Sequence, residues 1–211
     1  MKTIHGLNIP SSLADICNRQ AMALLVYDMQ AGIVSQIGDG EHVTIKVREA
    51  LEAARRAGMR IVFTRHLSLP KEMMGAAQYR MAMAWQRVET PEEVRPWFLR
   101  DSPGFQIVDR LAPLSSEAIF DKIAMSAFEG TPLTMTLRDC GITAIAIAGI
   151  AMEIGIEPTA RHAADLGFIP VILKDACGAG HKEAAERSLE ALKFTGDAII
   201  ADVAEFTSLL K

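Results

Sequence analysis

Apolar runs alternate with amphipathic stretches along most of this chain. The apolar runs predict strands buried on both faces, at Ala21–Tyr27, Met59–Thr64, Glu117–Phe120, Ile142–Ile147, Phe168–Leu173 and Ala198–Ala201. Apolar spacing or start signals predict helices at Glu41–Ala57, Leu133–Cys140, Gly155–Leu166, His181–Leu192 and Val203–Leu210. Strands and helices that alternate in this way predict an α/β fold, with a parallel sheet covered by helices on both faces.

The stretch from Ile142 to Thr159 joins the most continuous apolar run directly to a helix. Gly149 ends the run, and a short crossing segment leads to a helix start near Gly155. A helix start at the end of a parallel strand presents free N–H groups to a developing negative charge. An ordinary strand–turn–helix connection without chemistry has the same pattern, so this stretch alone leaves both interpretations open.

The segment from Leu67 to Pro113 departs from the alternation. Scattered prolines, methionines and both tryptophans predict loops and short helices lying over one edge of the sheet. Trp85 and the methionines can form an apolar cover over a cleft, with Arg80 or Arg87 holding an anionic substrate. Edge packing with solvated charges explains each residue equally well. The same composition is typical of subunit contacts, which favours a homo-oligomer.

Composition limits the possible partners. The 211 residues, of which 50% are hydrophobic, indicate one domain, residues 1–211, with a large core. A net charge of −4 without a basic cluster argues against nucleic acid and anionic membranes. No apolar run approaches the roughly 20 residues of a membrane span, and the N-terminus does not resemble a secretory signal. The cysteines are odd in number and widely spaced, as expected for reduced thiols of a cytoplasmic protein.

Polar residues follow several of the predicted strands. Asp28, His66, Lys122 and Asp175 should therefore converge on one crevice at the carboxyl edge of the sheet. A paired Asp28 and Lys122 can deprotonate a nucleophile or pass a proton to a substrate. The alternatives are an Asp28 that caps a turn and a solvated Lys122. His66 can orient a substrate carboxylate, carry a second proton or serve only as a hydrogen-bonded structural residue. No metal site is expected.

Four segments together resemble a known family. They are DMQ at Asp28–Gln30, FDKIAMSAFEGTPL at Phe120–Leu133, AGIAMEIGIEPTARHAADLGF at Ala148–Phe168 and DAC at Asp175–Cys177. In this order they resemble the isochorismatase-like superfamily, also called cysteine hydrolases, over nearly the whole chain apart from residues 67–113. The resemblance implies a three-layer α-β-α domain with a six-stranded, mostly parallel sheet. It also implies a dimer or tetramer that acts on a small molecule without a cofactor.

The resemblance further implies an Asp–Lys–Cys triad and a cis peptide before the nucleophile. Asp28 and Lys122 match the first two members, and the cis bond would join Ile150 and Ala151, with N–H groups near Ala151 and Gly155 facing the cleft as an oxyanion site. Phe128, within the second motif, is assigned to substrate binding. The third member is absent, because Gly155 stands where the family has cysteine.

Three functions are compatible with Gly155. The preferred one is a hydrolase of the isochorismatase type, in which Asp28 protonates an enol ether, water adds, and Gly155 leaves room for water or substrate. The second is a cysteine-dependent amidohydrolase for a small amide or ureide, with its cysteine lost naturally or replaced by engineering. The third is a non-catalytic ligand-binding relative. Substrate recognition is expected to differ from that of isochorismatases, since Arg65–His66 and Ala151 replace their Gln and aromatic residue, and the substrate is not assigned as isochorismate itself.

Overall fold

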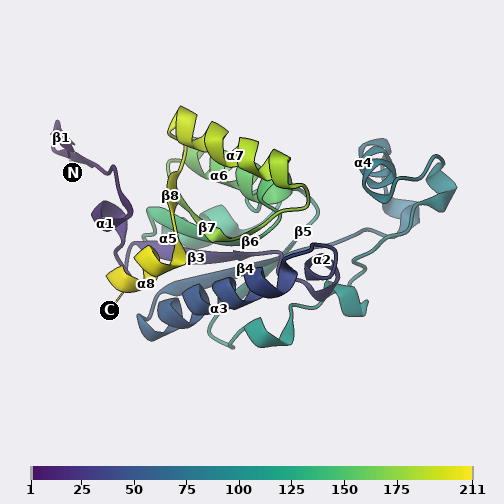
Figure 1. The fold of residues 1–211 in the computed structure, drawn as a ribbon, viewed down its shortest axis with the longest axis horizontal. Coiled ribbons are helices and arrows are strands. Elements are labelled where there is room, and N and C mark those ends of the chain that lie inside the picture. Colours follow the sequence, from purple (N-terminus) through teal and green to yellow (C-terminus); the bar gives the residue numbers. More distant parts are fainter. Residues whose placement is uncertain (1, 211) are drawn as a thin grey trace.

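The computed structural model describes residues 2–210 and shows a three-layer α/β/α fold (Figure 1). Six parallel strands form the central sheet in the order β5-β4-β3-β6-β7-β8. Their bounds are β3 Met22–Tyr27, β4 Arg60–His66, β5 Ala118–Lys122, β6 Ala144–Ile150, β7 Ile169–Gly178 and β8 Ile199–Ala201. The predicted fold class is confirmed.

Helices cover both faces of the sheet. Figure 1 shows α3 (Gly40–Arg56) and α8 (Val203–Leu209) on one face, and α5 (Leu133–Asp139), α6 (Glu157–Asp165) and α7 (Lys182–Thr195) on the other. The apolar stripe of α3 contains Val43, Val47 and Leu51, which are buried in the core on its side of the sheet. A stripe with this spacing places one helix face against the sheet and leaves the other for solvent.

The two central strands carry the site. Every residue of β3 and of β6 is buried, as expected for strands with helices on both sides. The six strands of the central sheet run in one direction, so the carboxyl ends of β3, β4, β5 and β6 lie along one edge of the sheet. At that edge Tyr27 is in register with Gly149, and His66 is in register with Lys122.

Strand β7 is longer than the sequence pattern predicts. It passes Leu173 and pairs again with β6 through an irregularity, up to Gly178. Asp175 therefore lies within the strand. Its Oδ1 accepts a hydrogen bond from the Val203 amide at 2.8 Å, and its Oδ2 lies 3.7 Å from Lys46 Nζ. The prediction that Asp175 joins the polar crevice is wrong, because this carboxylate binds the start of α8.

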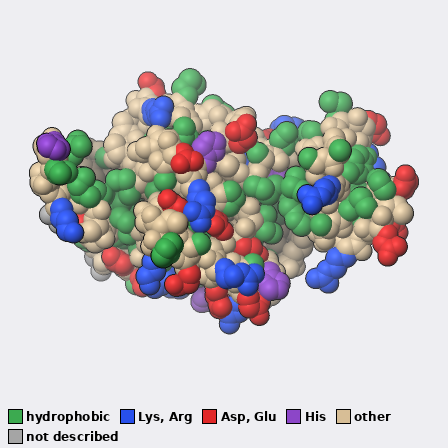
Figure 2. Space-filling view, turned by 90° about the horizontal axis from the view of Figure 1, so that it is seen from above, with side chains coloured by type: hydrophobic (Ala, Val, Ile, Leu, Met, Phe, Trp, Pro, Cys, Tyr) green, Lys and Arg blue, Asp and Glu red, His purple; other side chains and the backbone are tan. Residues whose placement is uncertain are grey.

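Residues 70–97 form a projection that we call the α4 arm. It contains α4 (Ala76–Gln86) and two 3₁₀ turns at Lys71–Met73 and Pro91–Glu93. The arm extends away from the body and does not lie over the sheet edge, contrary to expectation (Figure 1). No residue of α4 is buried, so the helix does not pack into the core beside the sheet. Figure 2 shows hydrophobic side chains on its surface.

Short elements complete the described chain. They are the hairpin β1 (Lys2–Ile4) and β2 (Leu7–Ile9), helices α1 (Leu13–Ile16) and α2 (Ala31–Val34), and 3₁₀ turns at Pro103–Phe105 and Asp109–Leu111. Among the helices of residues 2–210, none has the length and apolar character needed to cross a membrane.

Candidate active site

Asp28 is the first residue after β3 and is held by two neighbouring strands. Its φ of 47° is left-handed, a conformation that Asp tolerates better than most residues. The Thr64 hydroxyl donates to Asp28 Oδ1 at 2.7 Å, and Lys122 Nζ donates to Oδ2 at 2.7 Å. Each carboxylate oxygen therefore has a defined partner, which fixes the orientation of the group.

Lys122, the last residue of β5, is buried with the carboxylate. Besides Asp28, its ammonium donates to the Ala124 carbonyl at 3.2 Å and lies 4.3 Å from the centre of the Tyr27 ring. Burial lowers the pKa of Lys122, and the charge of Asp28 opposes that change. The predicted pairing of Asp28 with Lys122 is confirmed as geometry. A buried pair that accepts and returns protons is suited to general acid–base chemistry.

His66 ends β4 beside Lys122. Its backbone is fixed by the buried Gln30 side chain, which accepts from the His66 amide at 2.6 Å and donates to the His66 carbonyl at 3.1 Å. Burial, and then the charge of Lys122, lower the pKa of His66 to about 4. The imidazole is therefore neutral near pH 7 and can either donate or accept a hydrogen bond.

The turn after β6 contains a cis peptide bond between Ile150 and Ala151. A π-helical turn, Met152–Ile156, follows and leads into α6, which begins later than predicted. The Gly155 amide donates to the Ala151 carbonyl at 3.0 Å within this turn. The prediction that this amide faces the cleft as an oxyanion donor is therefore wrong. The assignment of Ile150 and Ala151 to such a site stays a prediction.

Gly155 does not leave an empty volume. A Cβ built on Gly155 would lie 2.6 Å from Tyr27 Cε1 and closer still to Cζ and to the hydroxyl oxygen. The Tyr27 hydroxyl donates to the Met125 carbonyl, and the side chain is buried. The expected room for water or substrate at Gly155 is thus taken by the Tyr27 ring, which sequence reasoning did not consider.

The cysteine thiols lie away from the Asp28–Lys122 pair. Cys17 and Cys140 precede β3 and β6, at the opposite edge of the parallel sheet. Cys177 lies on β7, two strands from β3, and its Sγ is 3.7 Å from the Ile147 carbonyl. Burial raises the pKa of Cys177 to about 12. A thiol held in its protonated form is a poor nucleophile.

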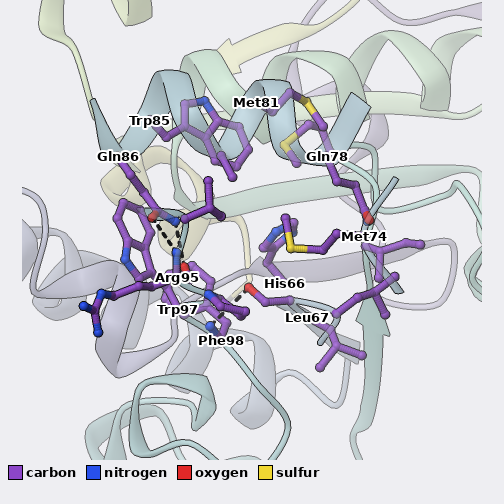
Figure 3. A pocket seen from close by; sticks show the side chains of 17 residues that line it. His66, Leu67, Met74, Gln78, Met81, Trp85, Gln86, Arg95, Trp97 and Phe98 are labelled. Atoms are coloured by element: carbon purple, nitrogen blue, oxygen red, sulfur yellow. Dashed lines mark hydrogen bonds between the residues drawn. The ribbon is translucent and has the colours of Figure 1, made fainter. Parts of the chain in front are cut away.

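A small cavity, partly open to solvent, begins at His66 and extends under the α4 arm (Figure 3). Met125 and Ile123, which follow Lys122, line it from the body. In Figure 3, Trp85 from α4 and Phe98 lie on opposite sides of His66; their ring centroids are 6.5 Å and 6.1 Å from the imidazole. The lining is mostly aromatic and aliphatic, so it suits an apolar part of a small molecule.

The structure separates the predicted substrate-binding residues. Trp85 and His66 line the cavity, whereas Arg80 and Arg87 are exposed and lie outside its lining. Arg80 is on the other face of α4, and Arg87 ends the helix in a left-handed conformation with φ 54°. Phe128 is buried in the core and stacks on Phe168 at 5.8 Å. The places of Arg80, Arg87 and Phe128 in the structure therefore do not support their predicted role in substrate binding.

Four residues of the site were not predicted as such. Thr64 and Gln30 orient Asp28 and His66, Tyr27 fills the space at Gly155, and the buried Thr159 donates to the Gly155 carbonyl at 2.6 Å. A polar residue inside an apolar run is a usable signal for Thr64. The sequence contains no signal for Tyr27, because a tyrosine fits a buried strand without any neighbour at Gly155.

Metal binding has no support in the described part of the chain. Within residues 2–210, no group of at least three His, Cys, Asp or Glu side chains is arranged to hold a metal ion.

Comparison with known proteins defines the family. The profile described as the Isochorismatase domain matches residues 22–205, which span the whole central sheet. The chain belongs to the isochorismatase family, and it is a hydrolase of that family. It is 33% identical over 175 residues to the uncharacterized isochorismatase family protein YecD of Escherichia coli O157:H7, covering 82% of this chain and 87% of the relative.

Two further matches extend the comparison. The chain is 28% identical over 172 residues to the ureidoacrylate amidohydrolase RutB of Klebsiella pneumoniae strain 342, covering 74% of this chain and 73% of the relative. The crystal structure of a cysteine hydrolase from Pseudomonas syringae pv. phaseolicola 1448A aligns with a TM-score of 0.78 and 22% identity, over 92% of this chain and 93% of that one. This last match shows the shared fold.

Proposed function

We propose that this hydrolase uses Asp28 as its general acid and base and water as its nucleophile, as in the hydrolysis of an enol ether. The supporting observation is the Asp28–Lys122 pair, 2.7 Å apart. Lys122 is in register with His66, which lines the cavity, while the two members of the pair are buried behind that lining. Gly155 supplies no side chain at the position of the family's nucleophile, and the cysteines of the described residues lie away from the Asp28–Lys122 pair. Chemistry that needs no protein nucleophile fits this set of groups.

In this mechanism the protonated carboxyl of Asp28 transfers its proton to the enol-ether carbon. The electrons of the C=C bond form the new C–H bond, and an oxocarbenium ion results. Asp28, now a carboxylate, accepts a proton from the attacking water, and the hemiketal collapses to a carbonyl compound and an alcohol. Lys122 stabilises the carboxylate form through its hydrogen bond to Oδ2. The aromatic cavity would hold the apolar part of the substrate.

A second candidate is an amidohydrolase related to the cysteine-dependent members of the family. The similarity to a ureidoacrylate amidohydrolase favours it. It requires that a cysteine once stood at residue 155. The close fit between Tyr27 and Gly155 argues against a recent or engineered replacement, since a side chain at 155 would overlap Tyr27.

Substitution of Asp28 by asparagine tests the proposal. Enol ethers, amides and ureides would be screened with the unmodified protein, and turnover of the best substrate would be compared with Asp28→Asn. We expect a loss of roughly 100- to 10,000-fold, because the proton donor is removed. Asp121→Asn is the control, since Asp121 precedes Lys122 but binds Arg65 and Arg100. Equal turnover by Asp28→Asn and the unmodified protein would refute the proposed role of Asp28.

The remaining expectations concern the class of substrate, the cellular location and the oligomeric state. A small-molecule substrate is expected from membership of this hydrolase family. Cytoplasmic location stays a prediction that rests on the three free cysteines. A homo-oligomer stays a prediction that rests on the composition of the α4 arm.

A further inference from the structure

The Tyr27 ring in its observed position requires glycine at residue 155. Gly155 is buried in the π-helical turn before α6, and Tyr27 is the last residue of β3. The built Cβ of residue 155 falls 2.6 Å from Tyr27 Cε1, and real Cβ atoms almost never approach a heavy atom within 3.0 Å. Any side chain at 155 therefore requires the Tyr27 ring to move.

The Tyr27 ring is fixed at this place. Only 2% of the residue is exposed, its hydroxyl donates to the Met125 carbonyl, and its ring faces the Lys122 ammonium at 4.3 Å. Movement of the ring would break the hydrogen bond and the cation–π contact together. The overlap at 155 cannot be relieved by rotation of a free surface side chain.

Tyr27 is not a substitute nucleophile. Burial, and then the charge of Asp28, raise the pKa of Tyr27 well above its ordinary value. The phenol therefore stays protonated and acts as a hydrogen-bond donor and as a wall beside Lys122. The Tyr27 ring fills the space that a nucleophilic side chain at residue 155 would need.

We propose that Tyr27 is the residue that fixes the reaction class of this enzyme, because its ring excludes a nucleophilic side chain at residue 155. Tyr27 and Gly155 then form a co-adapted pair, and Gly155 is native to the chain. The consequence for the reaction class rests on the proposed function, whereas the pairing itself does not.

The pairing is tested first by stability, with Gly155→Ala. The φ of Gly155 is not in the left-handed region, so alanine suits the backbone there. Overlap with Tyr27 should nevertheless lower Tm by roughly 3–10 °C. Gly38→Ala is the control, because Gly38 is exposed in a turn and nothing lies within 4 Å of a Cβ there. We expect its Tm to be unchanged or slightly higher.

Second substitutions at Tyr27 identify the cause. Tyr27→Val removes the ring, so the Tm penalty of Gly155→Ala should disappear in that background. Tyr27→Phe keeps the overlapping Cε1 and Cζ atoms, so the penalty should persist there. Tyr27→Leu replaces Tyr27→Val if the valine variant does not fold. Equal penalties in the tyrosine and valine or leucine backgrounds would overturn the pairing.

Thiol reactivity tests the consequence for chemistry. In Tyr27→Val/Gly155→Cys the new thiol has room beside Asp28 and Lys122, and iodoacetamide should label residue 155, with a pH midpoint below about 8.5. In Gly155→Cys alone, labelling of folded protein at that residue should be at least tenfold slower. Equal labelling of the two variants, mapped by mass spectrometry, would overturn the proposal. Neither readout needs a substrate, so failure here is distinct from failure of Asp28→Asn.

Discussion

The imidazole of His66 connects the charged pair to the cavity. Its side chain lies between the rings of Trp85 and Phe98, while its backbone is tied to Gln30. This packing leaves little water to solvate a charged imidazolium. The neutral ring is therefore the form that the folded protein stabilises.

A pH titration of stability tests this state of His66. The pKa of His66 is about 4 in the folded protein, below its ordinary value of 6.5, so the unfolded chain binds this proton more readily. The contribution of neutral His66 to the free energy of unfolding is complete above pH 6.5. It is lost as the pH falls towards 4, by up to roughly 3 kcal/mol. Chemical denaturation of His66→Gln should show a correspondingly smaller decline over this range.

His42→Gln is the control for that titration, because His42 is an exposed residue on α3. This variant should lose as much stability between pH 6.5 and 4 as the unmodified protein does. If His66→Gln and the unmodified protein lose stability in parallel between pH 6.5 and 4, then His66 is not held neutral by its surroundings.

The α4 arm is the element that shapes the cavity. Met81, Ala82 and Trp85 line the cavity from the inner side of α4, and Arg80 lies on the other side of the helix. Trp85 follows Met81 by four residues and Ala82 by three, which aligns the three side chains on one helix face. The arm thus presents an apolar roof to the cavity at His66.

Trp85→Ala should weaken substrate binding more than turnover. Loss of an aromatic contact of about 1.4 kcal/mol corresponds to a KM about 10-fold higher, with kcat little changed. Arg80→Ala, on the same helix but outside the cavity lining, should leave KM unchanged. The role of the roof would be refuted by a Trp85→Ala enzyme with an unaltered KM.

Regular elements were predictable from sequence and irregular ones were not. The buried strands β3 and β6 follow from continuous apolar runs, and Asp28 and Lys122 from their places at strand ends. The position of the α4 arm could not be predicted from the sequence, because exposed Met and Trp residues do not indicate in which direction a segment extends from the body. The extension of β7 through Asp175 depends on pairing across an irregularity opposite Gly149, which local pattern does not encode.

At the scale of the whole molecule, large apolar side chains are exposed at several places, and the α4 arm carries four of them, Met73, Met81, Trp85 and Trp97. Met73 is 69% exposed there, and Trp97 and Trp85 are 38% and 42% exposed. Figure 2 shows such side chains on the projecting lobe. An extended arm with Met, Trp and Arg on its surface is suited to contact a second subunit.

A charge on the arm should therefore change the size of the particle. We expect light scattering with size-exclusion chromatography to show a dimer or tetramer, and Met73→Glu to shift it towards the monomer. Met135→Glu, at a residue that is 70% exposed on α5, is the control and should have no effect. A monomeric unmodified protein at micromolar concentration would contradict the prediction.

The most direct test of water as the nucleophile is turnover by a chain without cysteine. Cys17→Ser, Cys140→Ser and Cys177→Ala would be combined, and activity measured on the substrate found in the screen. The account predicts turnover equal to that of the unmodified enzyme, and loss of that turnover when Asp28→Asn is added. A cysteine-free chain that folds but has no activity, together with a thioester trapped on one of the three cysteines in the unmodified protein, would contradict it.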